Sequence, residues 1–429
     1  MFGFANFLLL ALFAAAVFDL IFALARGGGL RGALHGLWNT PHLLFEQQLA
    51  EWRLQLGRIL FAAGLAAYEI SVVFCNSMAR QNWAWVQGVM SPVLEWLAFL
   101  CFGAKILFGT RYTWRELLAG GALYFIARWV YFNSQNIWWI GIVVAVLAAK
   151  DVPLRRPLQV YFASGCAAMA VVLALHFAGI VAPDLTSERM GALRGTYGYG
   201  HPNTFGGLVF GLVLAYALLR AQKVRWVDCL LVFAVGVFLL VGPASRSAAL
   251  CTLALAVGLV FCRLRAGHSV PRWWPGTCAG MVGLTAAVSY LLPLLVIKVG
   301  PWNNDIGPAW LAKLDSLLTC RISLTWMAYR LLDVKIAGQV FNWPTVDNSF
   351  AFALFQFGPV VAALLGILFA AALLGHAKQG RRVEVCCLFA MLAYAYMEVQ
   401  PFHLTTNPTA LLLCGAVFAQ TSARWQKIE

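Results

Sequence analysis

The sequence predicts an all-α fold, a polytopic bundle of transmembrane helices that forms a single integral membrane domain over residues 1–429. Of the 429 residues, 62% are hydrophobic and only 11% are charged, and the mean hydropathy is +0.77. Apolar runs of roughly 20 residues recur along the chain, and a helix of that length crosses the hydrocarbon core of a bilayer. No internal repeat and no soluble domain is visible.

About thirteen spans are expected, of which the fifth and the twelfth are short. They cover residues 4–25, 58–78, 85–108, 113–132, 136–149, 157–182, 204–222, 225–242, 245–263, 274–298, 349–375, 383–398 and 404–422. Segment 26–57 follows the first span with a Gly-rich turn and is expected to be a cytoplasmic interfacial segment. Asp19 interrupts the first apolar run and no basic region precedes it, so we expect no cleaved signal peptide.

The basic residues orient these spans. Twenty-one of the 31 lysines and arginines fall in one set of alternate connecting segments, and nine fall in the opposite set. By the positive-inside rule the first set is cytoplasmic, which places the N-terminus outside and the C-terminus inside. Because the basic residues gather at helix ends rather than along one stripe, the net charge of +14 does not indicate nucleic-acid binding.

This orientation makes residues 299–348 a long extracytoplasmic loop. Four tryptophans favour an ordered structure for it, and long ordered loops are usually functional. On a helix over 310–332, a stripe from Trp310 to Leu331 would be apolar except for Arg321, with Asp315 on the polar face. A buried guanidinium needs an anionic partner, so Arg321 either pairs with a nearby carboxylate, extends to the interface, or awaits an anionic ligand.

Two further outer segments carry candidate ligand-binding residues. Arg246 begins a span in GPASRSAAL, where a cap from Ser245 or Ser247 would leave an arginine beside a helix N-terminus, an arrangement suited to phosphate. The alternative is an interfacial anchor. The second segment, GALRGTYGYGHPNTFGG, could bind sugar or could be a flexible turn with a capping asparagine; its candidates are Arg194, Tyr199, His201 and Asn203.

The last two outer segments supply carboxylates. Asp347 and Asn348 stand at the start of a span, where Asp347 is either a helix cap or a general base. Glu398 and His403 occupy the last outer turn, and both are candidate substrate-binding residues, as is Asn348. Glu398 is either a base or an arginine partner. Burial would raise the pKa of Asp347 and adjacent arginines would lower it, and the sequence does not decide between them.

The order of these pieces resembles the O-antigen ligase and Wzy-type polysaccharide polymerase superfamily, over about half of the chain from Arg194 to Pro408. The motifs are HPN (His201, Pro202, Asn203), SRS (Ser245, Arg246, Ser247), LDSLLTCRISL with Arg321, and VDNSF with Asp347 and Asn348, followed by Gly358. The HPN motif looks more like that of the polymerases of exopolysaccharide and capsule pathways than that of the ligases.

The resemblance implies a GT-C-like fold in a bacterial plasma (inner) membrane, with an active site facing the outside or periplasm. It implies inverting glycosyl transfer from an undecaprenyl-diphosphate-linked glycan without metal or cofactor. Arg246 and Arg321 match positions that bind the diphosphate, and Asp347 stands where ligases carry a histidine. Many relatives have a small residue, usually glycine, where this chain has Cys320.

The expected function is therefore a polysaccharide polymerase that joins lipid-linked repeat units. The alternatives are a ligase of the same superfamily acting on another acceptor, and a lipid-linked oligosaccharide flippase or transporter using intramembrane charges such as Glu69 and Asp228. The expected partners are the lipid-linked glycan and the bilayer, with no nucleic acid. A chain-length regulator and a flippase are the candidate protein partners.

Overall fold

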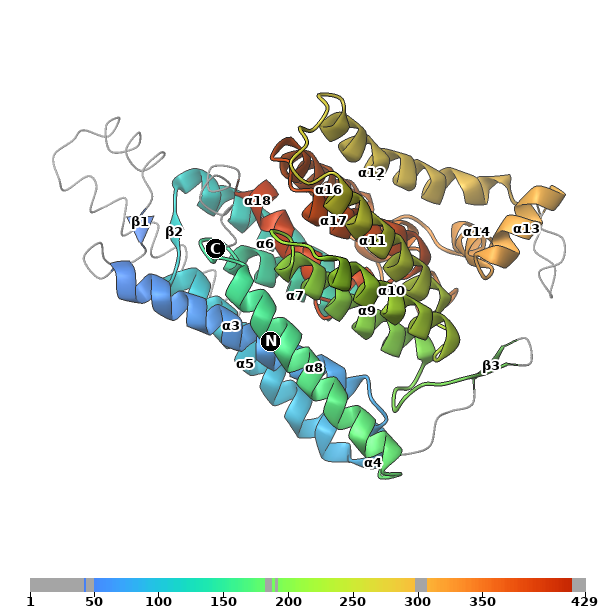
Figure 1. Cartoon of the computed structure of the whole chain (residues 1–429), viewed down its shortest axis with the longest axis horizontal. Helices are drawn as coiled ribbons and strands as arrows, with labels where there is room; N and C mark the ends of the chain where they lie inside the picture. Colours follow the sequence, from blue (N-terminus) through green and yellow to red (C-terminus); the bar gives the residue numbers. More distant parts are fainter. Residues whose placement is uncertain (1–41, 44–49, 182–186, 190–191, 298–306, 419–429) are drawn as a thin grey trace.

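The computed structural model describes residues 42–43, 50–181, 187–189, 192–297 and 307–418, and these are mostly helical (Figure 1). Within them, strand β1 (His42–Leu43) pairs antiparallel with β2 (Arg111–Tyr112). Strand β3 (Ser187–Arg189) pairs in the same way with β4 (Ala192–Arg194). The described residues therefore confirm the all-α prediction.

The helices fall into two consecutive groups along the chain. The first contains α3 (Ala50–Cys75), α4 (Ala79–Asn82), the π-turn η1 (Val86–Met90), α5 (Ser91–Phe108), α6 (Trp114–Ser134), α7 (Ile137–Ala148) and α8 (Arg155–Phe177). The second begins with α9 (Pro202–Leu219), α10 (Trp226–Val241), α11 (Arg246–Leu264), α12 (Trp274–Leu291) and η2 (Leu292–Leu295). It continues with α13 (Ala309–Leu317), α14 (Arg321–Leu331), α15 (Ser349–Phe352), η3 (Ala353–Phe357), α16 (Pro359–Lys378), α17 (Arg382–Met397), η4 (Gln400–Phe402), η5 (Pro408–Leu413) and α18 (Cys414–Val417).

Packing places α9 near the centre of the bundle. Helix α3 packs on α5 and α8, α10 on α11, and α12 on α16. Helix α9 contacts α8, α11 and α17, and most of its length is buried. Figure 1 shows α13, α14 and β3 together at one end of the bundle, and β1 and β2 at the other. The candidate residues at the start of α9 and α11 thus lie at the same end as the long loop.

Seven helices of the described ranges are long and apolar enough to cross a membrane. They begin at Glu51, Val86, Arg155, Pro202, Arg246, Trp274 and Pro359. The apolar helices Ile137–Ala148, Trp226–Val241 and Pro408–Val417 are shorter, and α17 has 16 residues. The predicted first span, 4–25, lies outside the described residues. The structure thus has membrane-length apolar helices, and the count of thirteen stays a prediction.

Two predicted boundaries are wrong. Residues 50–57 were expected in an interfacial segment, but they are the first two turns of α3 and continue directly into the next span; residues 26–41 and 44–49 of that segment lie outside the described part. The last predicted span, 404–422, contains a 3₁₀ turn and a four-residue helix instead of one continuous helix up to Val417.

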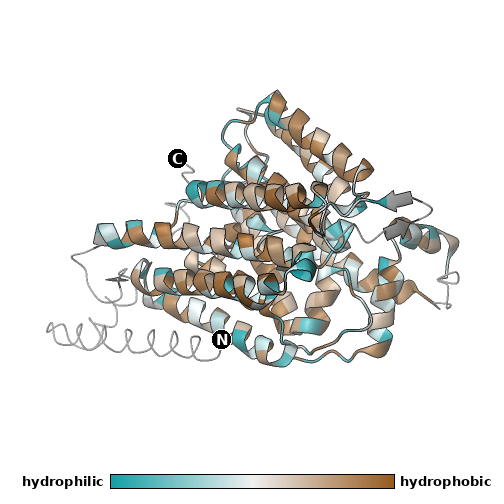
Figure 2. Ribbon diagram, turned by 90° about the horizontal axis from the view of Figure 1, so that it is seen from below, coloured by the Kyte–Doolittle hydropathy of each residue, from teal (hydrophilic) through white to brown (hydrophobic). Residues whose placement is uncertain are grey.

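The surface of the bundle is apolar along its helices. Large side chains such as Val227, Val257 and Ile367 are 71%, 67% and 65% exposed. Figure 2 shows hydrophobic colour along most helices and hydrophilic colour concentrated near helix ends and in connections. Exposed apolar surface of this extent is costly in water and favourable in lipid, so it fits helices that lie in a bilayer.

The predicted span 349–375 is interrupted at Gly358. The chain passes from α15 through the π-turn η3 to Gly358, whose φ is +87°, and Pro359 then starts α16. A Cβ on Gly358 would collide with the backbone carbonyl of Ile336, because the loop segment ending at Gly338 lies directly on the break. The left-handed backbone and the close approach both require glycine. This break joins the long loop to the bundle.

We expect Gly358→Ala to destabilise the protein by about 2–3 kcal/mol, because alanine disfavours positive φ and its Cβ cannot avoid a backbone carbonyl. Thermal unfolding of the purified protein in detergent measures this. Gly366→Ala is the matched control on α16, since a Cβ there has no neighbour within 4 Å; it should be neutral or stabilising by up to about 1 kcal/mol. Equal unfolding midpoints for the two variants would contradict the account of the break.

Candidate functional site

The described part of the long loop contains two short helices instead of the single helix expected over 310–332. Helix α13 ends at Leu317, and Thr319 and Cys320 adopt left-handed backbone, with φ of 59° and 64°. Helix α14 then starts at Arg321. Because the helix is interrupted, the residues from Trp310 to Leu331 do not form one continuous stripe, and that part of the prediction is wrong. The break, rather than a stripe, sets the position of Arg321.

Asp315 holds this break together. It was expected on a polar face, but it is fully buried. Its Oδ1 accepts hydrogen bonds from the backbone N–H groups of Ile322 (2.7 Å) and Ser323 (3.2 Å), and its Oδ2 accepts one from the Ser323 hydroxyl (2.8 Å). The first N–H groups of a helix lack intrahelical partners and favour an anion, so Asp315 caps α14. Sequence patterns miss this cap because it comes from the preceding helix.

Arg321 is buried, with 8% of its side chain exposed, and it has an internal anionic partner. Its Nη1 donates to the Leu318 carbonyl (3.2 Å) and the Thr319 hydroxyl (2.8 Å). Its Nη2 donates to Glu398 Oε1 at 2.5 Å. The first two bonds fix the guanidinium against the break, and the third joins α14 to the end of α17.

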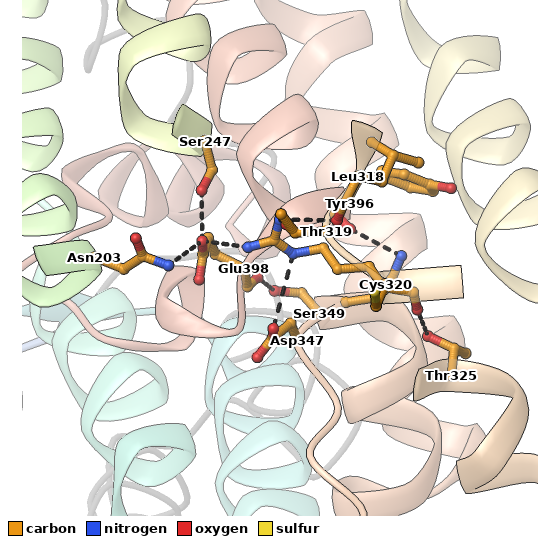
Figure 3. Close-up of polar contacts among 12 residues, drawn as sticks. Asn203, Ser247, Leu318, Thr319, Cys320, Thr325, Asp347, Ser349, Tyr396 and Glu398 are labelled. Carbon is orange, nitrogen blue, oxygen red and sulfur yellow. Dashed lines mark hydrogen bonds and ion pairs between the residues drawn. The ribbon is translucent and has the colours of Figure 1, made fainter. Parts of the chain in front are cut away.

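Glu398 is the centre of the site, as Figure 3 shows. It is 4% exposed, and three donors from three helices converge on its Oε1. These are Arg321 Nη2 of α14, the Ser247 hydroxyl of α11 at 2.5 Å, and Asn203 Nδ2 of α9 at 3.1 Å. The Ser349 hydroxyl of α15 donates to the Glu398 backbone carbonyl at 2.5 Å. One residue therefore joins five elements that lie far apart in the sequence.

Asn203 is held in place by a second arginine. Its Oδ1 accepts hydrogen bonds from Arg194 Nη2 (2.9 Å) and the Ser245 hydroxyl (3.4 Å), which directs its Nδ2 toward Glu398. Arg194 is buried and also donates to the Ala244 carbonyl at 3.3 Å. The two serines expected as caps of α11 therefore have other roles, since Ser245 contacts Asn203 and Ser247 contacts Glu398. That capping prediction is wrong.

Asp347 lies beside this centre and is more accessible. Its Oδ2 is 3.9 Å from Arg321 Nε, and 31% of its side chain is exposed. Burial raises the pKa of Asp347 above its usual range, while Arg321 and His201 act in the opposite direction. It is not the helix cap: Asn348 caps α15, accepting from the N–H groups of Phe350 and Ala351. Asp347 is thus a carboxylate near two basic groups with access to solvent.

Arg246 and His201 lie on the exposed side of the site. Arg246 is exposed at the start of α11, one residue before Ser247. His201 is exposed, its Nδ1 accepts a hydrogen bond from the Asn203 backbone N–H (3.1 Å), and it caps α9. The site therefore has a centre of buried Arg321 and Glu398 with half-buried Asn203, and more accessible residues around it: Arg246, His201 and Asp347.

Three residues expected to contact substrate have other surroundings. Tyr199 is fully buried and packs on Phe205, so it belongs to the core. The Oδ1 of Asn348 accepts the cap hydrogen bonds, and its Nδ2 donates to the Ser289 hydroxyl (3.0 Å) and the Tyr396 carbonyl (3.1 Å). The His403 ring lies 3.8 Å from the Trp138 ring, between centroids, and burial lowers its pKa to about 3. A structural role accounts for each of them.

Among the described residues, no group of three or more His, Cys, Asp or Glu side chains is arranged to hold a metal ion. Comparison of the chain with protein-family models, curated proteins and solved structures gave no match. The geometry and charge of the site therefore carry the functional assignment.

The pH dependence of stability should report on Glu398. Burial raises its pKa to about 7 against the lowering effects of Arg321 and Ser247. The folded state then binds the proton more tightly than the unfolded state, so this group's stabilisation is complete below about pH 4.5 and is lost as pH rises through 7.

We expect wild type to lose stability relative to Glu398→Gln between pH 5 and pH 8, as measured by thermal unfolding in detergent. Asp347→Asn is the comparison variant: it keeps the Glu398 carboxyl and its burial and removes only the smaller contribution of Asp347 to the raised pKa of Glu398, so most of the pH-dependent loss should remain. A difference between wild type and Glu398→Gln that does not change with pH would contradict a raised pKa.

Proposed function

We propose that this protein is a polysaccharide polymerase that joins undecaprenyl-diphosphate-linked oligosaccharide units by metal-independent, inverting glycosyl transfer. The proposal includes a GT-C-like bundle of about thirteen spans in a bacterial inner membrane, with the site on the extracytoplasmic face. The observation that carries it is the gathering of Arg194 and Arg321 around two carboxylates at one end of an apolar bundle, with Arg246 exposed next to Ser247.

Positive charge is what this reaction needs. Cleavage of the bond between the anomeric carbon and the diphosphate oxygen leaves concentrated negative charge on the leaving group. Fixed guanidinium groups stabilise that charge in the transition state, and they act most strongly where water is scarce. Arg321 is held in place by three hydrogen bonds, and Arg246 is exposed one residue before Ser247, which contacts Glu398.

Asp347 is the candidate general base. It takes the proton from the acceptor hydroxyl as that oxygen forms a bond to the anomeric carbon, while the bond to the diphosphate breaks and the electron pair leaves with the lipid diphosphate. A raised pKa increases the basicity of the carboxylate, and 31% exposure gives an acceptor access to it. One base opposite one leaving group suits a single displacement with inversion.

Apolar surroundings suit a lipid-linked donor. A largely apolar cavity between α7, α12, α16 and α17 reaches Ser349, whose hydroxyl contacts Glu398; Val282, Leu365 and Met391 are among its lining residues. Apolar side chains are also exposed just after the C-terminal end of α12 and on α13: Leu294, Ile297 and Leu317 are 61%, 76% and 69% exposed. These surfaces allow a hydrocarbon carrier to stay in an apolar environment while its diphosphate reaches the arginines.

Arg321→Ala should lower the rate of polymer formation at least 100-fold, because a fixed positive charge at the leaving group is lost. Purified protein, a lipid-diphosphate-linked oligosaccharide and product sizing make the measurement. Arg330→Ala is the matched control, since Arg330 is exposed on the same helix and lies over the Trp326 ring. Long polymer from Arg321→Ala, or no glycosidic bond from wild type, would overturn the assignment.

The same assay separates the alternatives. A polymerase lengthens the glycan on the lipid carrier, a ligase of the same superfamily transfers it to another acceptor, and a transporter forms no glycosidic bond.

Asp347→Asn should reduce the rate by about 10²–10⁴-fold while leaving the KM for the donor within a few-fold, because it removes the base and keeps the size of the side chain. Initial rates at several donor concentrations give both values. A full rate in Asp347→Asn would assign the base elsewhere and leave the roles of the arginines standing.

A further inference from the structure

The donors around Glu398 form an anion-binding site, and the Glu398 carboxylate occupies it. The hydrogen bonds to its carboxylate from the described residues all go to Oε1: 2.5 Å from Arg321 Nη2, 2.5 Å from the Ser247 hydroxyl and 3.1 Å from Asn203 Nδ2. A guanidinium, a hydroxyl and an amide N–H₂ that point at one oxygen would serve a phosphate oxygen equally well. We call Arg321, Ser247 and Asn203 the cradle.

Two of the three cradle residues, Arg321 and Asn203, are oriented independently of Glu398. Arg321 is fixed by Leu318 and Thr319 on its own side, and Asn203 is oriented by Arg194 and Ser245 through its Oδ1. Neither set of contacts involves the Glu398 carboxylate. Removal of that carboxylate would therefore leave two oriented donors and the Ser247 hydroxyl without an acceptor, which is costly in a largely buried place unless another anion takes its position.

The charge balance also favours exchange. Arg194 and Arg321 balance an ionised Asp347 and Glu398, and the exposed Arg246 next to Ser247 adds a positive charge nearby, so the surplus is at most small. A diphosphate brings more negative charge than this surplus can balance while Glu398 stays ionised in the cradle. The approach is from the exposed side of the site, because Arg246 is exposed and Asp347 is 31% exposed, whereas Glu398 is 4% exposed.

We propose that Glu398 is a resident anion of the diphosphate site: the donor's diphosphate enters the cradle by displacing the Glu398 carboxylate, whose return expels the diphosphate product. This inference rests on the function proposed above and deepens it. Glu398 is then a positioning residue that competes with the substrate for Arg321, Ser247 and Asn203 instead of contacting the reacting atoms.

The change in pyrophosphate affinity when the Glu398 charge is removed tests this proposal. Inorganic pyrophosphate is titrated into the purified full-length protein in detergent, and its Kd is measured by calorimetry for wild type and Glu398→Gln. Loss of the competing charge should tighten pyrophosphate binding at least 10-fold. Arg321→Ala should weaken it below wild type, and Arg330→Ala should leave it unchanged. Equal or weaker binding to Glu398→Gln overturns the resident-anion role.

A second readout separates this role from a merely structural one. Glu398→Gln should lower the KM for the lipid-linked donor and also lower kcat, because the diphosphate product leaves more slowly; a structural defect lowers kcat without lowering KM. Glu398→Asp, with a shorter and therefore weaker competing carboxylate, should have an intermediate pyrophosphate Kd. It serves as the test if Glu398→Gln does not fold.

The failure of this inference is distinguishable from that of the proposed function. If wild type forms polymer and Glu398→Gln binds pyrophosphate no more tightly than wild type, the resident-anion role is wrong and the polymerase assignment stands. If no variant binds pyrophosphate and wild type forms no glycosidic bond from the donor, both are wrong.

Discussion

The ion pair between Arg321 and Glu398 is the interaction on which the rest of the site depends. It links the first residue of α14, in the long loop, to the residue that follows α17. A buried ion pair compensates for its desolvation only when its remaining hydrogen-bonding groups are satisfied. Here Thr319 and the Leu318 carbonyl satisfy Nη1 of the arginine, while its buried Nε has no hydrogen bond and lies 3.9 Å from Asp347 Oδ2. Ser247 and Asn203 donate to the same carboxylate oxygen as Arg321. The pair thereby fixes the loop against α9 and α11.

Helix caps hold the loop in the position that this pair requires. Asp315 caps α14 from the preceding helix, and Asn348 caps α15 where the loop re-enters the bundle. Gly338 and Gly358 let the loop backbone lie on the break before α16. These residues do no chemistry, and they leave Asp347 and Arg246 as accessible charged groups. This separation between residues that position the loop and residues that face solvent explains why the neighbours Asp347 and Asn348 have different roles.

Composition and periodicity were enough to predict the all-α class and apolar helices of membrane length, because both follow from burying backbone polar groups in lipid. The candidate site was predictable in part, since isolated charges in apolar surroundings identified Arg321, Asp347 and Glu398 before their contacts were known. The partnership of Arg321 with Glu398 was not predictable, because 77 residues separate them.

Other features were missed for local reasons. The break before Arg321 relies on left-handed Thr319 and Cys320, and neither residue type predicts positive φ. The cap by Asp315 depends on that break, so a continuous helical stripe placed it wrongly. Tyr199 is a sugar-binding candidate by its place in a glycine-rich segment, and such a segment does not reveal which aromatic ring faces the core.

A double-mutant cycle on Arg321 and Glu398 tests the central claim most directly. The free energy of unfolding is measured in detergent at pH 8, where Glu398 is mostly ionised, for wild type, Arg321→Ala, Glu398→Ala and the double variant. The account predicts a coupling energy of about 1.5–3 kcal/mol between the two positions, because each single variant leaves a buried charge without its partner. Additive effects, with coupling below about 0.5 kcal/mol, would contradict it.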